Sequence, residues 1–404
     1  MALIALLTDT HIGARKGSKF IQDHFQKFYR EVFFPTIREL NVDAVIHLGD
    51  AFDSRKTIDL QSLRWAKDEI FEPLSDFKVH MVVGNHDAYY KNTNLTNSPE
   101  LILKDYSNIQ TYSNPQQITI SGEKILLLPW ICEENRAKSL EMINKSNARF
   151  AMGHLELAGF YSHRGHTFEE DRTIISNDAL AKFDKVFSGH FHTRSDNGKI
   201  YYIGNPYEMF WNDVDDPRGF VVFDTETQDI QYYNNSNTLF HIIYYEDINY
   251  KLFNASRYAN KIVKVVVRKK SSQKDFDKFI DKLISVGVYD LKIVENFTIT
   301  ESGDFSVDDI EENTLSLLNR YIEDIDVDGD IDTDRIKSLD AHIAKEAGIT
   351  VSAAKQERRN AIPVKRYGTT EEFGAACAFL CSQYAGFIVG QNILLDGGAI
   401  NSTM

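Results

Sequence analysis

At 404 residues the chain is long enough for two or three domains, and no stretch approaches the roughly 18 consecutive apolar residues of a membrane span. Three cysteines are too few for a disulfide framework, so we expect a reducing, cytoplasmic compartment and no membrane partner.

The net charge of −14 would oppose binding to nucleic acid if it were spread evenly along the chain. Residues 301–346, however, carry 15 acidic and only 4 basic side chains, which leaves a net charge of −3 on the other 358 residues. The acidity is therefore concentrated in one segment and does not exclude a basic groove elsewhere.

Five apolar runs of strand character each end in polar residues suited to binding an ion or an oxyanion. The runs are 3–7, 44–48, 79–83, 150–152 and 186–187, and they are followed by Asp9, His11, Asp50, Asn85, His86, His154, His190 and His192. Ligands of open α/β sheets bind at the carboxyl ends of the strands, so we expect these side chains to lie close together.

Seven of these residues would complete a two-metal site, namely Asp9, His11, Asp50, Asn85, His154, His190 and His192. Oxygen and imidazole ligands suit manganese, iron or zinc, and the carboxylates and the amide favour manganese. With Asp50 as a bridging carboxylate, the set would hold two divalent ions about 3.5–4 Å apart, as in-line displacement at phosphorus requires. A histidine taken alone is more simply a core or surface residue, but the complete set favours the metal site.

Two loops near these strand ends carry basic side chains. Residues 13–19 include Arg15 and Lys16, whose functional interpretation is contact with phosphate. Residues 159–166 include Tyr161 and Arg164, and basic residues mixed with aromatic ones suit single-stranded DNA. These four side chains are therefore candidate DNA contacts. Solvated surface loops are the alternative.

Helices and further strands complete a first domain, for which we expect residues 1–236. Apolar residues at helical spacing predict helices near 21–34 and 57–77, and Trp65 and Phe71 fall outside the inner stripe of the second. Strands are expected within 118–130, and the segments 199–203 and 219–224 would complete the second half of a two-sheet sandwich. The expected fold class is α/β, a two-sheet β-sandwich flanked by helices.

The strand-end motifs resemble those of the calcineurin-like metallophosphoesterases in type and in order: Asp9-x-His11, Gly49-Asp50, Gly84-Asn85-His86-Asp87, Gly153-His154 and Gly189-His190-x-His192. Within that family, residues 1–339 resemble the SbcD-type nuclease subunit that works with an SMC-like ATPase. Three further segments carry this likeness: Pro129–Asn135, Ser188–Thr193 and Asp216–Phe220. The resemblance implies a metallophosphoesterase fold and a metal-dependent DNA nuclease with exonuclease and single-strand endonuclease activity.

The resemblance also implies roles for the site residues. One ion would be held by Asp9, His11, Asp50 and His192, and the other by Asp50, Asn85, His154 and His190. His86 would be catalytic, protonating the leaving oxygen or stabilising the charged transition state. Many cellular relatives carry a histidine where this chain has Asp53, and either Asp53 or Asp87 would support the His86 imidazolium.

Two protein partners follow from the same resemblance. One is an SbcC-type, SMC-like ATPase subunit. The other is a second copy of the chain, in a homodimer formed by the helix at 57–77 and the helix after Pro99. For Trp65 and Phe71, an ordinary surface aromatic pair is the alternative.

Residues 237–302 would form a small α+β domain that resembles the capping domain of this family, which narrows access of DNA. A strand at 262–267, a helix at 275–286 and a strand at 291–299 make up a β-α-β unit. Lys269 and Lys270 lie between its first strand and its helix and are further candidate DNA contacts.

By the same resemblance, residues 303–339 would form an acidic helical segment that binds the ATPase. A lone helix of this length is marginal in water, so we expect it to need a partner surface. Residues 324–331 match the first eight positions of an EF-hand loop. Arg335, however, stands where that loop needs a bidentate glutamate. An acidic linker is therefore favoured over a calcium site.

Residues 340–404 resemble the carboxyl-terminal end of a short-chain dehydrogenase, most densely between Ile362 and Gly398. The segment contains neither the glycine-rich dinucleotide turn nor the Tyr-x-x-x-Lys pair of that family. We therefore expect a grafted, non-catalytic fragment and no nicotinamide cofactor.

Two other functions are weighed against the nuclease. The first is a small-molecule phosphodiesterase or phosphatase, against which the capping domain and the basic approach to the site argue. The second is a non-catalytic scaffold that tethers DNA, against which the complete ligand set argues.

Overall fold

The computed structural model describes residues 2–169, 175–249, 252–270, 272–295, 344, 349–380, 385, 395 and 397. Its internal contacts divide the chain into two compact units, Met1–Ile299 and Thr300–Met404. The predicted acidic helix and the EF-hand-like loop lie outside the described residues.

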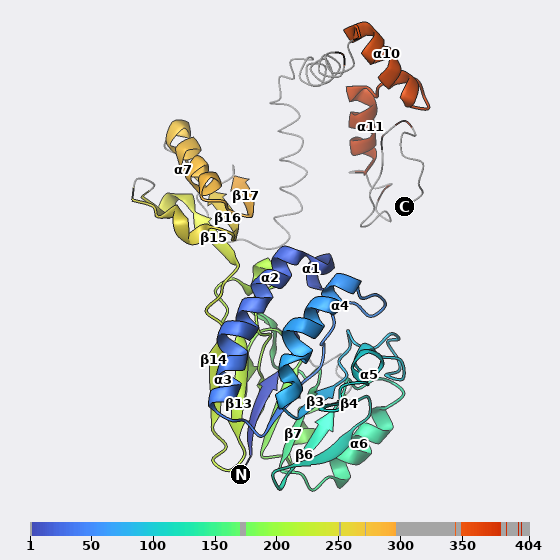
Figure 1. Ribbon diagram of the computed structural model, residues 1–404, viewed down its shortest axis with the longest axis vertical. Helices are drawn as coiled ribbons and strands as arrows, with labels where there is room; N and C mark the ends of the chain where they lie inside the picture. The colour runs from blue at the N-terminus through green and yellow to red at the C-terminus, as the bar shows by residue number, and fades with distance from the viewer. Residues whose placement is uncertain are drawn as a thin grey trace. The chain divides into compact units, whose positions relative to one another are not determined.

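Two six-stranded sheets form the centre of the first unit (Figure 1). The first has the order β14 (Ile230–Asn234), β13 (Gly219–Asp224), β1 (Leu3–Leu7), β2 (Ala44–His47), β3 (Val79–Val82), β4 (Ile109–Tyr112). The second has the order β11 (Ser195–Asp196), β12 (Ile200–Tyr202), β10 (Lys185–Gly189), β7 (Phe150–His154), β6 (Glu123–Leu128), β5 (Gln116–Ile120).

Side-chain alternation along the strands builds two layers of core. In β1, Ile4 and Leu6 pack with residues of the second sheet such as Phe150, whereas Ala5 and Leu7 pack towards the helices. Because both faces of the sheet are covered, both sets of alternating positions are apolar. The expected α/β fold with a two-sheet sandwich is confirmed.

Helices cover the outer face of the first sheet. α1 (Ala14–Gly17) precedes α2 (Lys19–Lys27), and a π-helical turn (Phe28–Phe33) joins α2 to α3 (Phe34–Glu39). Figure 1 shows α2, α3 and α4 (Leu60–Ala66) lying over this face. Their buried residues, including Phe25, Phe34 and Ala66, pack against the outward-facing residues of β1 and β2. The remaining helices of the sandwich are α5 (Ser98–Leu103) and α6 (Arg136–Lys145).

The structure corrects two expectations about packing. Phe71 is 1% exposed, not part of a surface pair, because a π-helical turn at Lys67–Phe71 rotates it towards Phe52 and Tyr106. The segment Gly219–Asp224 does not complete the second sheet with Ile200–Tyr202. As β13 it pairs antiparallel with β1 in the first sheet, with Leu3 opposite Asp224.

A smaller three-stranded parallel sheet consists of β15 (Phe240–Tyr244), β16 (Ile262–Val267) and β17 (Asp290–Glu295). α7 (Gln273–Ser285) packs on it through Phe276, Phe279 and Leu283. The sequence predicted the β-α-β unit but missed β15. A separate hairpin is formed by β8 (Tyr161–His163) and β9 (His166–Thr167).

In the second unit, the structure describes the helices α10 (Val351–Ala361) and α11 (Thr370–Leu380). Thr350 caps α10 by accepting a hydrogen bond from the Ala353 amide. On α11, Phe373, Phe379 and Leu380 are exposed. None of the helices in the described part of the chain is both long and apolar enough to span a bilayer.

Candidate metal centre

Chain direction brings the predicted ligands together. β1, β2 and β3 run parallel, as do β7 and β10, so each set ends at one edge of its sheet. Among the described residues, three groups place possible ligand atoms within 4.8 Å of one another: Asp9, His11 and His192; Asp50, His154 and His190; and His11, Asp53 and His86.

The first half of the centre joins the end of β1 to the loop after β10. The Nε2 atoms of His11 and His192 face each other at 3.1 Å. Asp9 Oδ1 lies 3.9 Å from the first nitrogen and 3.8 Å from the second. Three potential ligand atoms thus surround one point between the two sheets.

The second half joins the end of β7 to the loop after β3. Asn85 Oδ1 lies 2.9 Å from both His154 Nε2 and His190 Nδ1. Asp50 Oδ2 is 3.3 Å from His154 Nε2 and 3.9 Å from His11 Nε2. Asp50 therefore contacts both halves, as a bridging carboxylate must.

Several of these residues have unfavourable backbone conformations. Asp9, His11, Asp50 and His190 have φ values of 50°, 43°, 54° and 88°. Left-handed backbone is uncommon in residues other than glycine, and it concentrates at functional sites. At Gly84, a Cβ atom would clash with the backbone and carboxylate of Asp50. The turns at the strand ends are thus shaped to bring the donor groups together.

The centre brings carboxylates and imidazoles together, and Asp9, Asp50 and His154 among them are buried. Burial opposes ionisation of Asp50, but the attraction of His154 outweighs it and holds the pKa of Asp50 well below its usual value. Burial likewise disfavours a charged His154, yet the Asp50 carboxylate raises the pKa of His154 to about 9. The donor set fits divalent cations, which would replace protons as the positive charge between these groups.

His86 lies beside the centre. Its Nδ1 is 2.7 Å from the Asp53 carbonyl oxygen, and its amide donates to Asp50 Oδ1 at 2.7 Å. Its ring stands edge-on to that of His11, with centroids 4.9 Å apart. His86 is therefore held by backbone contacts at the border of the first half.

Support of His86 by a carboxylate is not what the structure contains. The Asp53 carboxylate lies 3.3 Å from His11 Nδ1, and only its backbone carbonyl contacts the His86 ring. The Asp87 carboxylate accepts hydrogen bonds from the amides of Phe52 and Gly84. Asp87 is therefore used to hold the two loops together.

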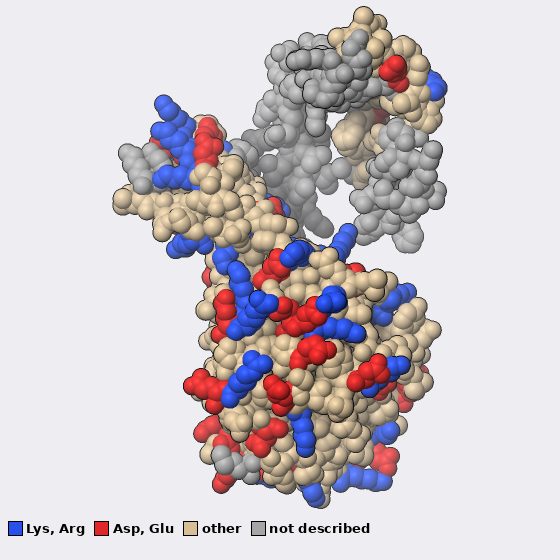
Figure 2. All heavy atoms as spheres, in the orientation of Figure 1, with Lys and Arg blue, Asp and Glu red and all other residues tan. Residues whose placement is uncertain are grey.

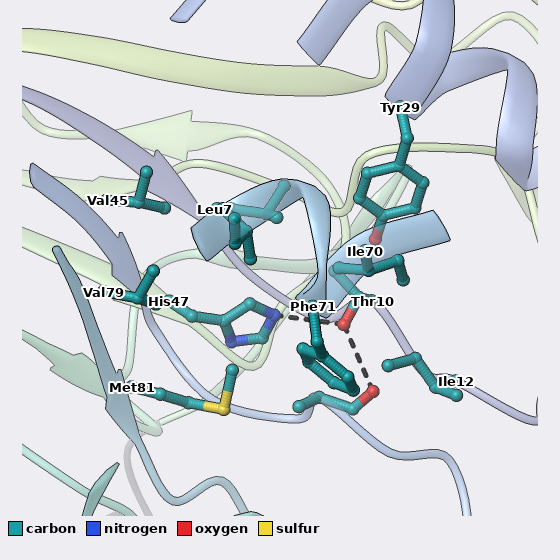
Figure 3. Close-up of a pocket in the computed structure, with 12 residues that line it drawn as sticks. Leu7, Thr10, Ile12, Tyr29, Val45, His47, Ile70, Phe71, Val79 and Met81 are labelled. Atoms are coloured by element: carbon teal, nitrogen blue, oxygen red, sulfur yellow. Dashed lines mark hydrogen bonds between the residues drawn. The ribbon is translucent and has the colours of Figure 1, made fainter. Parts of the chain in front are cut away.

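His47 is a buried histidine near the centre. It lines an apolar cavity whose wall also includes Tyr29 and Phe71 (Figure 3). The Gly49 amide donates to His47 Nδ1, so His47 Nε2 carries the proton and donates to Thr10 Oγ1 at 3.0 Å. Thr10 in turn donates to the Ala51 carbonyl at 3.2 Å. Burial lowers the pKa of His47 to about 3, so this chain of hydrogen bonds is uncharged.

Arg218 is a further residue that the sequence interpretation left without a role, although it lies in the quoted segment Asp216–Phe220. It is 3% exposed and donates to the His192 carbonyl oxygen. It also donates to Asn205 Oδ1, to Asp213 Oδ1 at 2.9 Å and to Asp216 Oδ2 at 2.8 Å. Arg218 therefore fixes the backbone of a predicted ligand.

Glu156 was also missed. Its Oε1 lies 3.2 Å from His190 Nε2. The only signal in the sequence is its position two residues after His154, which places it beyond the same strand end. Spacing of this kind is too common to identify a contact with a histidine 34 residues later.

The candidate DNA contacts lie on three separate elements. Arg15 and Lys16 belong to α1, Tyr161 and Arg164 to the β8–β9 hairpin, and Lys269 and Lys270 to the turn before α7. Arg15 lies over the Phe210 and Phe240 rings, at 5.9 and 5.8 Å from their centroids. Tyr161 is 47% exposed, whereas Arg164 donates to the Val214 carbonyl at 3.2 Å.

Figure 2 shows basic and acidic residues interspersed over the face formed by α2, α3 and α4. This face therefore carries no continuous basic surface among the residues described there.

Comparisons with known proteins give two separate matches along the chain. Residues 2–194 match the calcineurin-like phosphoesterase family, and residues 340–400 match the family described as enoyl-(acyl carrier protein) reductase. Over 324 residues the chain is 36% identical to exonuclease subunit 1 of Enterobacteria phage T4, a match that covers 79% of this chain and 91% of that protein.

The carboxyl-terminal match is short. Over 74 residues the chain is 39% identical to the NADPH-dependent reductase BacG of Bacillus subtilis, which is 18% of this chain and 29% of the reductase. Among solved structures, an archaeal phosphodiesterase matches 58% of this chain and 99% of its own, with 14% identity. Its TM-score of 0.31 is too low to define a shared fold.

Proposed function

The chain belongs to the calcineurin-like phosphoesterase family, and from that premise we propose that it is a two-metal DNA nuclease with exonuclease and single-strand endonuclease activity. The observation that carries the proposal is the position of Asp50, which contacts ligand groups of both halves of the centre. The identity to a phage exonuclease subunit supports DNA as the substrate.

In this proposal Asp9, His11, Asp50 and His192 hold one ion, and Asp50, Asn85, His154 and His190 hold the other. Two bound divalent ions, of which manganese suits the mixed donors best, would neutralise the phosphate charge and activate water for attack. The protein fixes their positions through strained strand ends and through buried supports such as His47 and Arg218.

His86 is the proposed catalytic residue. With Nδ1–H donating to the Asp53 carbonyl, the proton that can be gained or lost is the one on Nε2. Protonated His86 would give this proton to the departing sugar oxygen or stabilise the charge on the phosphate. Asp53 would act twice, through its carbonyl on His86 and its carboxylate on His11.

The rest of the chain would serve substrate access and assembly. We propose that the domain at 237–302 narrows the approach to the centre, and that residues 303–339 bind an SMC-like ATPase. Leu60, the first residue of α4, is 83% exposed, and Leu101 on α5 is 64% exposed. They are candidates for the contact between two copies of the chain.

The test uses the purified chain with labelled single- and double-stranded DNA and with bis-p-nitrophenyl phosphate, each with manganese and with a chelator. We expect metal-dependent cleavage of DNA, and DNA binding that weakens steeply as salt rises because phosphate contacts release counterions. Cleavage of the small diester with no cleavage of either DNA would instead identify a small-molecule phosphodiesterase. DNA binding without any hydrolysis would identify a scaffold.

A further inference from the structure

Glu156 contacts the outer nitrogen of a proposed ligand. Its Oε1 is 3.2 Å from His190 Nε2, and the two side chains are 25% and 17% exposed. On the opposite side of the ring, His190 Nδ1 is 2.9 Å from Asn85 Oδ1 and so faces the second half of the centre. The imidazole thus has its two nitrogens assigned to different partners.

The two nitrogens of a neutral imidazole cannot both act as ligands or both carry a proton. Only the tautomer with the proton on Nε2 leaves a free electron pair on Nδ1, which is the nitrogen that faces the centre. A carboxylate beside Nε2 stabilises that proton and therefore selects this tautomer. Without it, a rotation of the ring about Cβ–Cγ would no longer be opposed by a hydrogen bond at this end.

Two other imidazoles of the centre have a polar group beside Nδ1. His154 Nδ1 is 2.8 Å from the Leu48 carbonyl, and His11 Nδ1 is 3.3 Å from the Asp53 carboxylate without a hydrogen bond to it. His154 is therefore oriented by the backbone, whereas His190 has a carboxylate at hydrogen-bond distance. His190 also has a φ of 88°, which is unfavourable for a residue other than glycine. The backbone conformation therefore does not by itself favour the observed position of the His190 ring.

We propose that Glu156 is a positioning residue for the second metal-binding half: it fixes His190 as the Nε2–H tautomer with Nδ1 directed at the ion. In the first half, the Asp53 carboxylate lies beside His11 Nδ1 at 3.3 Å. This inference rests on the proposed function, because it takes His190 as a metal ligand.

The test measures metal binding directly, without substrate. Calorimetric titration of the metal-free protein with manganese and with zinc would compare Glu156→Ala, Glu156→Gln and the unmodified chain. We expect Glu156→Ala to weaken the affinity for one of the two ions about 10–100-fold and to leave the other unchanged. The affinities of Glu156→Gln should be close to those of the unmodified chain, because the amide oxygen of glutamine can still accept a hydrogen bond from His190 Nε2–H.

Glu123→Ala is the matched control. Glu123 is also partly buried, with 20% of its side chain exposed, and it pairs with Arg149 away from the centre. Its replacement should change neither affinity. Thermal melts in the presence of chelator would establish that each variant is folded. If Glu156→Ala does not fold, Glu156→Leu replaces it in the comparison with Glu156→Gln.

A second readout separates orientation from general structural damage. In protein labelled with ¹⁵N-histidine, with the His190 signals assigned from a His190→Gln variant, the unmodified chain should show a proton on Nε2. Glu156→Ala should show a mixture of tautomers or a proton on Nδ1. Unchanged affinity for both ions together with an unchanged tautomer would overturn the inference. Failure of the proposed function is a different result, namely an unmodified, metal-loaded chain that does not cleave DNA.

Discussion

The two units place the same kinds of side chain in opposite surroundings. In the first, Arg218 is 3% exposed between Asp213 and Asp216, and Phe52 and Phe71 are buried. In the second, Arg366 pairs with Glu372 at 53% and 51% exposure, and Phe373 is 62% exposed. Both units match a known enzyme family in sequence, and the possible metal-binding clusters found among the described residues all lie in the first.

A match to a short part of an enzyme does not by itself establish that this segment has the activity of that enzyme. The reductase-like segment corresponds to 29% of BacG, and none of the possible metal-binding clusters found among the described residues lies in it. A catalytic centre needs groups from several strands, and a fragment of a sheet cannot supply them. Changes in the first unit should therefore abolish function, and equivalent changes in the second should not.

The largest effect is expected from Asp50→Ala. This carboxylate contacts ligand groups of both halves, so its loss should remove both ions and all measurable cleavage. Elemental analysis and cleavage rates on labelled DNA provide the measurement. Glu372→Ala in the second unit is the control and should leave both quantities unchanged. Retention of two ions at unmodified affinity would show that Asp50 is not the bridge.

His86→Ala should lower the cleavage rate about 100–10,000-fold while two ions per chain remain bound. His86 borders the first half, where its ring contacts the Asp53 carbonyl and its amide donates to the Asp50 carboxylate, so its ring is not part of the proposed ligand set. The metal content and the rate are measured on the same preparation. Loss of an ion would make His86 a ligand, and an undiminished rate would remove it from the mechanism.

Arg218→Leu should destabilise the first unit by about 3–5 kcal/mol, because Asp213 and Asp216 would be left buried without their partner. The matched change, Arg366→Leu, breaks a solvent-exposed pair and should leave the melting temperature unchanged. Thermal and denaturant unfolding of both variants test this. Equal melting temperatures for the two variants would contradict the contrast between the units.

Metal affinity should fall as the pH is lowered below about 9. The Asp50 carboxylate, acting against burial, raises the pKa of His154 to about 9, so below this pH a proton occupies the nitrogen that an ion must bind. With one proton displaced, affinity should change about tenfold per pH unit and level off above pH 9. Calorimetry in buffers of different ionisation enthalpy would count the protons released. An affinity independent of pH between 6 and 9 would argue against His154 as a ligand.

The smallest effect is expected from ending the chain at Leu339. The cleavage rate and the melting temperature of the first unit should not change, and solubility should improve because exposed apolar residues such as Phe373 and Phe379 are removed. A loss of activity, or a melting temperature lowered by several degrees, would mean that the reductase-like fragment is an integrated part of the fold.

The sequence by itself determined which residues could form the centre and at which edge of the sheets they would lie. Strand polarity is fixed by the chain, so polar residues that follow parallel apolar runs must gather at the carboxyl ends. The same local reading predicted the two-sheet sandwich and the β-α-β unit, whose periodicities are short-range. It also predicts no dinucleotide site in the last 65 residues, because the required local motifs are missing from them.

Only the tertiary structure decided which side chain supports which histidine. Asp53 points its carboxylate at His11 and not at His86, Glu156 reaches His190 from another strand end, and Arg218 binds the backbone of His192. β13 pairs with β1 from more than 200 residues away, and a π-helical turn buries Phe71. These contacts depend on rotamers, on local departures from ideal helices and on pairings between distant segments, and none of these is encoded in the spacing of residues along the chain.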